Sequence, residues 1–402
     1  MNQKKITKDV GHERVAPTFK SSRYKTLDLW RGFSALWVMT FHSFATVYSV
    51  EQSFATQIIK FLANPGWLGV HIFFVISGYC VAANAHSLLR KQQTSFQFLG
   101  DRFLRILPTY WSSILATVAI SIIAIPLNHT KLLDNLPNSL TDWIANIFLI
   151  QPYLHVEPYV VVYWSLAVEV GFYLLVALLY DAYQRIHSQE FSSKLIDSEY
   201  KLFLPQGFFR KVLSQKFILH DYLLFFVSFV FTIACKFEPL QSFGTVINLW
   251  PEFYCGILAF LVLHFWDTER IKSYFLLAFI IFFGFLGFVE HLQWSTLSFS
   301  SMIACSLCLL YIWDNRLAKM RTLSWLKHLG TMSYSLYLLH VPILGRVINL
   351  GNRYIELKSP YYLLLHLVGW LITISVCYVF YRVVEKPFQD WRYSLKQQAS
   401  QR

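Results

Sequence analysis

Two side chains on the first apolar segment have the chemistry to bind an anion and to move a proton. Arg31 and His42 are eleven positions apart, which places both on one face of a helix and about 16 Å apart along its axis. A guanidinium binds phosphates or carboxylates, and an imidazole suits general-base catalysis near neutral pH. Asp28 lies one turn before Arg31, close enough for an ion pair, but about 21 Å from His42. Any group that orients His42 must therefore come from another helix, unless His42 is a packed histidine bonded to a neighbour.

Four more ionisable residues stand out because a charge within a membrane helix costs at least about 2.5 kcal/mol. Arg102 and Arg105 are one turn apart, so their guanidiniums could bind phosphate together or could anchor the chain to lipid headgroups. Glu169 lies about two turns inside a later apolar segment, where an ion pair and a catalytic or proton-relay role are both open. His340 lies near the middle depth of another segment.

Small residues mark a second region of interest. The run Gly66–Tyr79 (GWLGVHIFFVISGY) contains three glycines and ends in Ser77, Gly78 and Tyr79. Because small residues let helices approach closely, packing explains these glycines as well as a binding site does.

The sequence contains none of the common metal or nucleotide motifs. HExxH, the Cys and His spacings of zinc sites and the Walker glycine loop are all missing. The six cysteines are scattered, and Cys305 and Cys308 have CxxC spacing inside an apolar segment, which is typical of buried thiols. We therefore expect no metal site and no bound cofactor.

The composition places these residues in a membrane protein. Of the 402 residues, 55% are hydrophobic, 18% are aromatic and only 14% are charged, whereas soluble domains carry about 25% charge. The mean hydropathy is +0.42. The formal net charge of +12 is divided into short blocks between apolar runs, a pattern that argues against nucleic acid as a partner and indicates membrane topology.

The hydropathy pattern predicts an all-α, polytopic membrane helix bundle of about ten transmembrane helices. A span needs roughly 20 apolar residues, and a run at 143–154 is too short, so we expect it to lie at the interface. The expected spans are 29–48, 66–86, 106–126, 161–181, 217–235, 248–266, 273–290, 296–313, 332–350 and 361–382.

The distribution of basic residues predicts the orientation of this bundle. With the N-terminus inside, the large majority of the 35 Lys and Arg residues fall in cytoplasmic segments, so both termini are expected in the cytoplasm. Residues 1–25 read as a basic cytoplasmic tail without a signal peptide, 26–388 as one transmembrane domain, and 389–402 as a cytoplasmic C-terminal tail. At the end of the last span, Glu385 and Lys386 are expected to pair with each other. Pro387 is expected to terminate the helix there.

Six runs, in order along the chain, resemble the acyltransferase family 3 membrane proteins, which include bacterial O-antigen and exopolysaccharide O-acetyltransferases. The resemblance covers about residues 25–388. It is carried by LDLWRGFSALWVMTFH at 27–42, GWLGVHIFFVISGY at 66–79, FLGDRFLRILPTY at 98–110, YWSLAVEVGFY at 163–173, SYSLYLLHVP at 333–342 and VEKP at 384–387. The chain departs from the pattern at Tyr79 and Cys80, where many members have two apolar residues, and we expect no appended hydrolase domain of the SGNH type.

The resemblance implies transfer of an acyl group, most often acetyl, from cytosolic acyl-CoA to a sugar hydroxyl. The family's arginine and histidine of the first helix fall on Arg31 and His42, and its paired arginines fall on Arg102 and Arg105. From these positions we expect His42 to act as the base, with Glu169 or His340 orienting it. The three arginines, together with Ser77 and Tyr79, are expected to bind the donor.

Several expectations about partners follow from the resemblance. The expected partners are an acyl-CoA co-substrate, which is most often acetyl-CoA in the family, a carbohydrate or glycolipid acceptor, and the lipid bilayer of a bacterial inner membrane. The outer loop 127–160 is the first candidate for acceptor contacts, although an interfacial aromatic belt also explains its composition. Direct transfer and an acyl-enzyme relay are both open.

A transporter or flippase without acyl transfer is the alternative, because buried His, Arg and Glu residues also line proton-coupled pathways. Against it, the motif of the first helix has no counterpart in the second half of the sequence, so an inverted repeat is not evident.

Overall fold

The computed structural model describes most of the chain, and all of its regular elements in the described part are helices. The described residues are 24–44, 54–90, 93–128, 136–187, 230–235, 244–265, 270–291, 296–356, 359 and 361–401. The expected tail 1–25 lies outside this part except for its last two residues, and so does the expected span 217–235 except for its end at 230–235.

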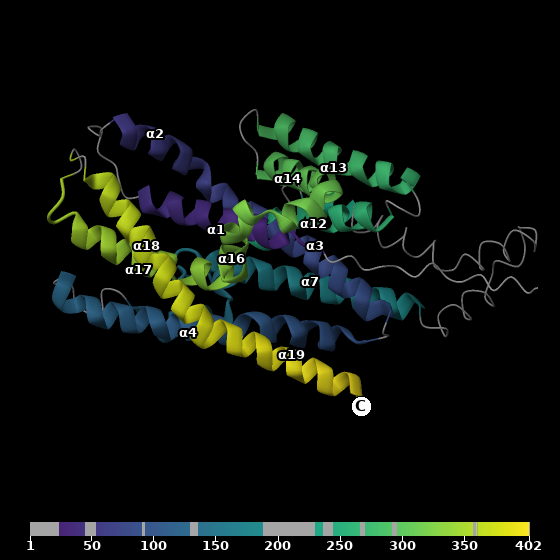
Figure 1. Ribbon diagram of the computed structural model, residues 1–402. Coiled ribbons are helices and arrows are strands. Elements are labelled where there is room, and N and C mark those ends of the chain that lie inside the picture. The colour runs from purple at the N-terminus through teal and green to yellow at the C-terminus, as the bar shows by residue number, and fades with distance from the viewer. Residues whose placement is uncertain are drawn as a thin grey trace, which may run out of the picture.

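The longer helices run close to one common direction and form a bundle (Figure 1). They are α1 (Leu27–Phe44), α3 (Gly69–Arg90), α4 (Ser95–Asn128), α7 (Tyr163–His187), α12 (Thr245–Phe265), α13 (Arg270–His291), α14 (Thr296–Leu310), α17 (Ser333–Gly351), α18 (Tyr362–Phe380) and α19 (Lys386–Gln401). The shorter helices are α2 (Phe54–Ala63), α5 (Leu140–Phe148), α6 (Gln151–Leu154), α15 (Asp314–Lys319) and α16 (Ser324–Thr331).

Within the described residues, seven helical stretches are long and apolar enough to cross a membrane. α1 and α17, which coincide with two further expected spans, pack against these stretches and against each other. The prediction of an all-α polytopic membrane bundle is therefore confirmed. The run at 143–154 forms α5 and α6, which are too short to span, as the sequence predicts.

Helix α4 begins earlier than the hydropathy pattern suggests. It starts at Ser95 instead of residue 106, because the polar first turns are helical although they are too charged to count as an apolar span. Arg102 and Arg105 consequently lie inside a long helix, on a turn that faces the rest of the bundle.

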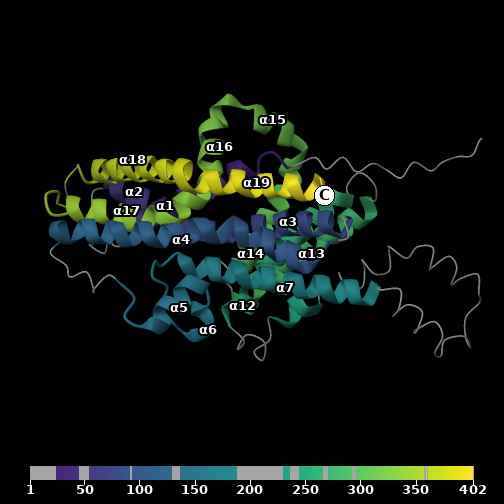
Figure 2. The ribbon, with the colours of Figure 1, turned by 90° about the horizontal axis from the view of Figure 1, so that it is seen from below.

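The prediction for the end of the last span is wrong. The chain does not stop after α18 but continues through a π-helical turn, Tyr381–Glu385, into α19, which runs beside α4 (Figure 2). Pro387 is the second residue of α19 and lies two residues after the π-helical turn, so it does not end the helix. Glu385 and Lys386 do not pair: Glu385 bonds to Ser335 on α17, and Lys386 bonds to Asp390.

Glycines allow the closest helix contacts. A Cβ atom on Gly78 of α3 would lie 2.0 Å from the carbonyl oxygen of Phe253 on α12, and one on Gly256 would lie 1.9 Å from that of Val75. Both distances are far below van der Waals contact, so only glycine fits where α3 crosses α12. Packing thus accounts for Gly78 in the Gly66–Tyr79 run, and it leaves the neighbouring Ser77 to be explained separately.

Candidate active site

A large cavity lies between α1, α3, α4, α7, α17 and α19, and we call it the basic cavity. Its volume is about 930 Å³. The charged side chains on its walls are Lys25, Arg31, Arg102, Arg105, Lys327, Arg392 and Lys396, against Asp28, Asp101, Glu169 and Glu385. Positive groups exceed negative ones, so the cavity suits an anionic ligand.

Arg31 lies where α1 and α3 meet at the cavity wall. Its Nη1 atom bonds the Asp28 carboxylate at 3.0 Å, the pair that the spacing predicts. Its Nη2 atom donates to Cys80 Sγ at 3.2 Å. Asp28 therefore neutralises part of the Arg31 charge, and the sulfur of α3 fixes the guanidinium at the wall.

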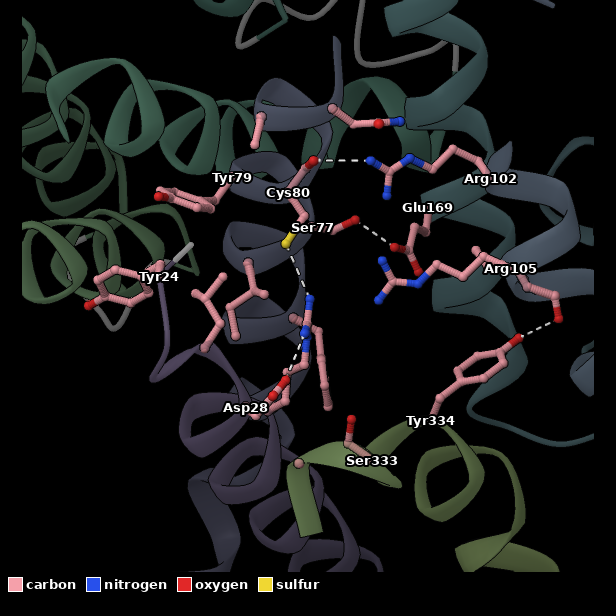
Figure 3. A pocket seen from close by; sticks show the side chains of 18 of the residues that line it. Tyr24, Asp28, Ser77, Tyr79, Cys80, Arg102, Arg105, Glu169, Ser333 and Tyr334 are labelled. Carbon is pink, nitrogen blue, oxygen red and sulfur yellow. Dashed lines mark hydrogen bonds and ion pairs between the residues drawn. The ribbon is translucent and has the colours of Figure 1, made fainter. Parts of the chain in front are cut away.

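The paired arginines of α4 differ in their surroundings. Arg102 is 5% exposed, lies 5.6 Å from the ring centres of both Phe98 and Tyr173, and donates to the carbonyl oxygen of Cys80 at 3.0 Å. Arg105 projects into the basic cavity (Figure 3). In the described part of the chain no side chain forms a hydrogen bond or close ion pair with its guanidinium. Arg102 is thus held by the protein, and Arg105 presents its donors to the cavity.

Glu169 lies across the cavity from the first turns of α1. Ser77 Oγ and Tyr173 OH both donate to the same Glu169 oxygen at 2.5 Å. Glu169 and Glu385 are also near enough to Arg105 to attract its charge. The structure therefore gathers Ser77, Glu169 and Arg105 in one polar cluster, which Figure 3 shows, and Tyr79 points away from it toward Tyr24.

The two histidines predicted from the sequence are in contact with each other. His340 Nε2 lies 3.2 Å from His42 Nδ1, and the rings are 5.1 Å apart at their centres. His340 is fully buried, and His42 is half-buried. Of the two groups expected to orient His42, the structure brings His340 to it and places Glu169 with Ser77 in the basic cavity instead.

Backbone carbonyls determine where the protons of this pair lie when both rings are neutral. His340 Nδ1 faces the carbonyl oxygens of Leu336 at 3.0 Å and Tyr337 at 2.9 Å, so this nitrogen donates and Nε2 accepts. His42 Nδ1 faces the carbonyl oxygen of Val38 at 3.0 Å and His340 Nε2, both acceptors, so it donates too. No described residue bonds His42 Nε2, so its lone pair is available to take a proton from a substrate.

Tyr337 separates the histidine pair from the basic cavity. Tyr337 lines the cavity, whereas His42 and His340 do not. Its hydroxyl bonds Ser165 Oγ at 2.7 Å, and its ring packs edge-on against Phe73 and lies 5.9 Å from the His340 ring. The Tyr337 ring therefore forms part of the cavity wall on the side of His340.

Sequence reasoning missed the role of Glu385. Its carboxylate is 3% exposed and accepts hydrogen bonds from Ser335, at 3.0 Å from the backbone N–H and 2.5 Å from the hydroxyl, and at 2.8 Å from Gln389 Nε2. It thereby satisfies a donor in the first turn of α17, the helix that carries Tyr337 and His340. No local signal marks this contact, because fifty residues separate Glu385 from Ser335.

The family of the chain follows from comparison with known proteins. No curated protein matches the sequence. Residues 24–382 match the acyltransferase-3 family, described as an acyltransferase domain, and this match includes the arginines of α1 and α4 and both histidines. Because it covers nearly the whole chain, the protein belongs to this family of acyltransferases.

Proposed function

We propose that the protein transfers an acyl group, most often acetyl, from cytosolic acyl-CoA to a hydroxyl of a sugar in a cell-surface or exported glycan. The observation that carries this proposal is the placement of Arg31 and His42 at the two ends of α1, one beside the basic cavity and the other beside His340. One helix thus joins an anion-binding region to a candidate base. In this proposal the protein is a multi-pass enzyme of a bacterial inner membrane.

The basic cavity is proposed to hold the donor. Arg105 is the main phosphate ligand because its guanidinium is open to the cavity, and Arg102 and Arg31 add positive potential from the walls. Ser77 and Glu169 are placed to contact the pantetheine arm, whose amides can donate to the open oxygen of Glu169. Tyr79, on the far side of α3 from Arg105, adds an aromatic wall to the cavity.

His42 Nε2 is proposed to be the general base. It takes the proton of the acceptor hydroxyl while the hydroxyl oxygen attacks the thioester carbonyl carbon. The carbon–sulfur bond then breaks, and the CoA thiolate leaves and takes up a proton. Val38 and His340 hold the Nδ1 side of the ring, so that Nε2 faces the reacting groups. Transfer can be direct, or it can pass through an acyl-enzyme.

The proposal is tested by free-thiol release from acetyl-CoA in membrane vesicles supplied with the host's glycans. Wild-type protein should release CoA and acetylate a glycan, and His42→Ala, matched for folded protein, should do neither. The control variant is His328→Ala, since His328 is exposed on α16 outside the basic cavity. Flux of a substrate without any release of CoA would instead identify the protein as a carrier.

A further inference from the structure

Helix α19 contributes a basic face to the mouth of the cavity. Gln389, Arg392 and Lys396 line the cavity, and their spacing of three and four residues places them on one side of the helix. Trp391 and Tyr393 lie on other sides and are exposed. Arg392 and Lys396, which we call the mouth cations, follow residue 382, where the match to the acyltransferase family ends.

The mouth cations share one carboxylate. Asp101 on α4 accepts from Lys396 Nζ at 2.8 Å and lies 3.9 Å from Arg392 Nε. Arg392 is also close enough to Arg102 and Arg105 for the three guanidiniums to repel one another. Asp101 can balance only one of the two mouth cations, while Glu169 and Glu385 lie near Arg105, so an anionic ligand would relieve the repulsion that remains at α19.

The mouth cations lie at the opposite end of the cavity from Tyr337. Glu385 bonds to Ser335, which lies two residues before Tyr337 on α17. From Glu385 the helix continues for seven and eleven residues to the mouth cations, which places them about 10 and 16 Å farther along its axis. A donor whose thioester lies near Tyr337 therefore extends its other end toward α19.

We propose that Arg392 and Lys396 bind the 3′-phosphate on the ribose of the CoA donor. This inference rests on the proposed function, because it takes acyl-CoA as the ligand. CoA carries a diphosphate in its middle and a separate phosphate at the end remote from the thiol. Arg105, deeper in the cavity, is placed for the diphosphate, and the mouth cations are placed for the remote phosphate. Asp101 bonds Lys396 and lies beside Arg392, so it holds both side chains at this position.

A lipid headgroup is the other source of phosphate at this position. The exposed Trp391 and Tyr393 are residue types that favour the membrane interface, where lipid phosphates are abundant. The ligand pair CoA and 3′-dephospho-CoA separates the two sources, because the two molecules differ only in the 3′-phosphate.

The test measures the affinity of both ligands for the full chain in nanodiscs by isothermal titration calorimetry. Wild-type protein should bind CoA about tenfold or more tightly than 3′-dephospho-CoA, since charge-assisted bonds to one phosphate are lost. In Arg392→Ala and Lys396→Ala this ratio should fall to within about threefold, while the affinity for 3′-dephospho-CoA stays near the wild-type value. Retained binding of 3′-dephospho-CoA also shows that each variant is folded.

Lys386→Ala is the matched control, because Lys386 is a lysine of α19 that pairs with Asp390 and lies outside the cavity. It should keep the wild-type ratio. An unchanged ratio in Arg392→Ala and Lys396→Ala overturns the inference and favours lipid phosphate as the partner of these cations. An equal loss for both ligands also overturns it. Binding of neither ligand by the wild-type protein would instead refute the proposed function and the inference together.

Discussion

The basic cavity and the histidine pair differ in how many of their polar and charged groups have partners within the protein. In the cavity, Arg105 has no hydrogen-bond partner within the described residues, and the positive groups outnumber the negative ones. In the histidine pair, carbonyl oxygens and the neighbouring ring bond three of the four nitrogens, and among the described residues His42 Nε2 has no partner. The contrast indicates a division of labour: the cavity is incomplete without an anion, and the pair is already arranged around one basic nitrogen.

The largest expected effect comes from removing that nitrogen. His42→Ala should lower turnover of acetyl-CoA by about 10²- to 10⁴-fold, the usual contribution of a positioned general base. The affinity for CoA should stay near the wild-type value, because His42 does not line the basic cavity. Thiol release and CoA titration on the same preparation check both statements. A parallel loss of affinity would contradict the division between the two regions.

Arg105→Ala should have the next largest effect, and on binding instead of chemistry. Loss of charge-assisted bonds to phosphate should weaken CoA binding about 10- to 100-fold. Arg105→Lys keeps the charge without the planar fork, so it should recover part of the affinity. Calorimetric titration with CoA measures both variants. Wild-type affinity in Arg105→Ala would show that its open guanidinium does not meet the donor.

His340→Ala should affect turnover less than His42→Ala does. The Val38 carbonyl still accepts from His42 Nδ1, so the preferred tautomer is preserved while the ring loses one support. We expect a decrease of about tenfold in turnover with unchanged CoA affinity. A loss as large as that of His42→Ala would mean that His340 carries a proton or an acyl group itself.

Tyr337→Phe should have the smallest effect. The change removes the bond to Ser165 and keeps the ring that packs on Phe73, so the free energy of unfolding should fall by about 1 kcal/mol. Thermal unfolding in detergent measures this loss.

Tyr337→Leu also removes the ring between the two regions, and it should allow donors with longer acyl groups to compete better with acetyl-CoA. An unchanged preference for acyl length would show that Tyr337 does not limit the passage.

The sequence predicts most of the elements and one contact of the site, because those depend on local patterns. Apolar length predicts the spans, and helical spacing predicts the bond between Arg31 and Asp28. The pairing of His42 with His340 could only be proposed as one of two options, since no local rule relates α1 to α17. The assignment of Glu169 to the other region required the fold.

The C-terminal region shows why the remaining part was missed. Residues 389–402 are polar, so the sequence suggests a tail, and Pro387 suggests the end of a helix. The structure instead uses Pro387 in the first turn of α19 and buries Glu385 against α17. The partner of Asp101 on α4 is therefore a residue almost three hundred positions away, and hydropathy contains no information about such a contact.

The most direct test of the division of labour measures CoA affinity and thiol release for His42→Ala and Arg105→Ala in parallel. We expect His42→Ala to bind CoA as the wild-type protein does and to release almost no thiol. Arg105→Ala should bind CoA weakly but recover much of its thiol release when acetyl-CoA is raised to saturation. If both variants lose affinity and saturated turnover to the same extent, the cavity and the histidine pair do not have the separate roles assigned to them.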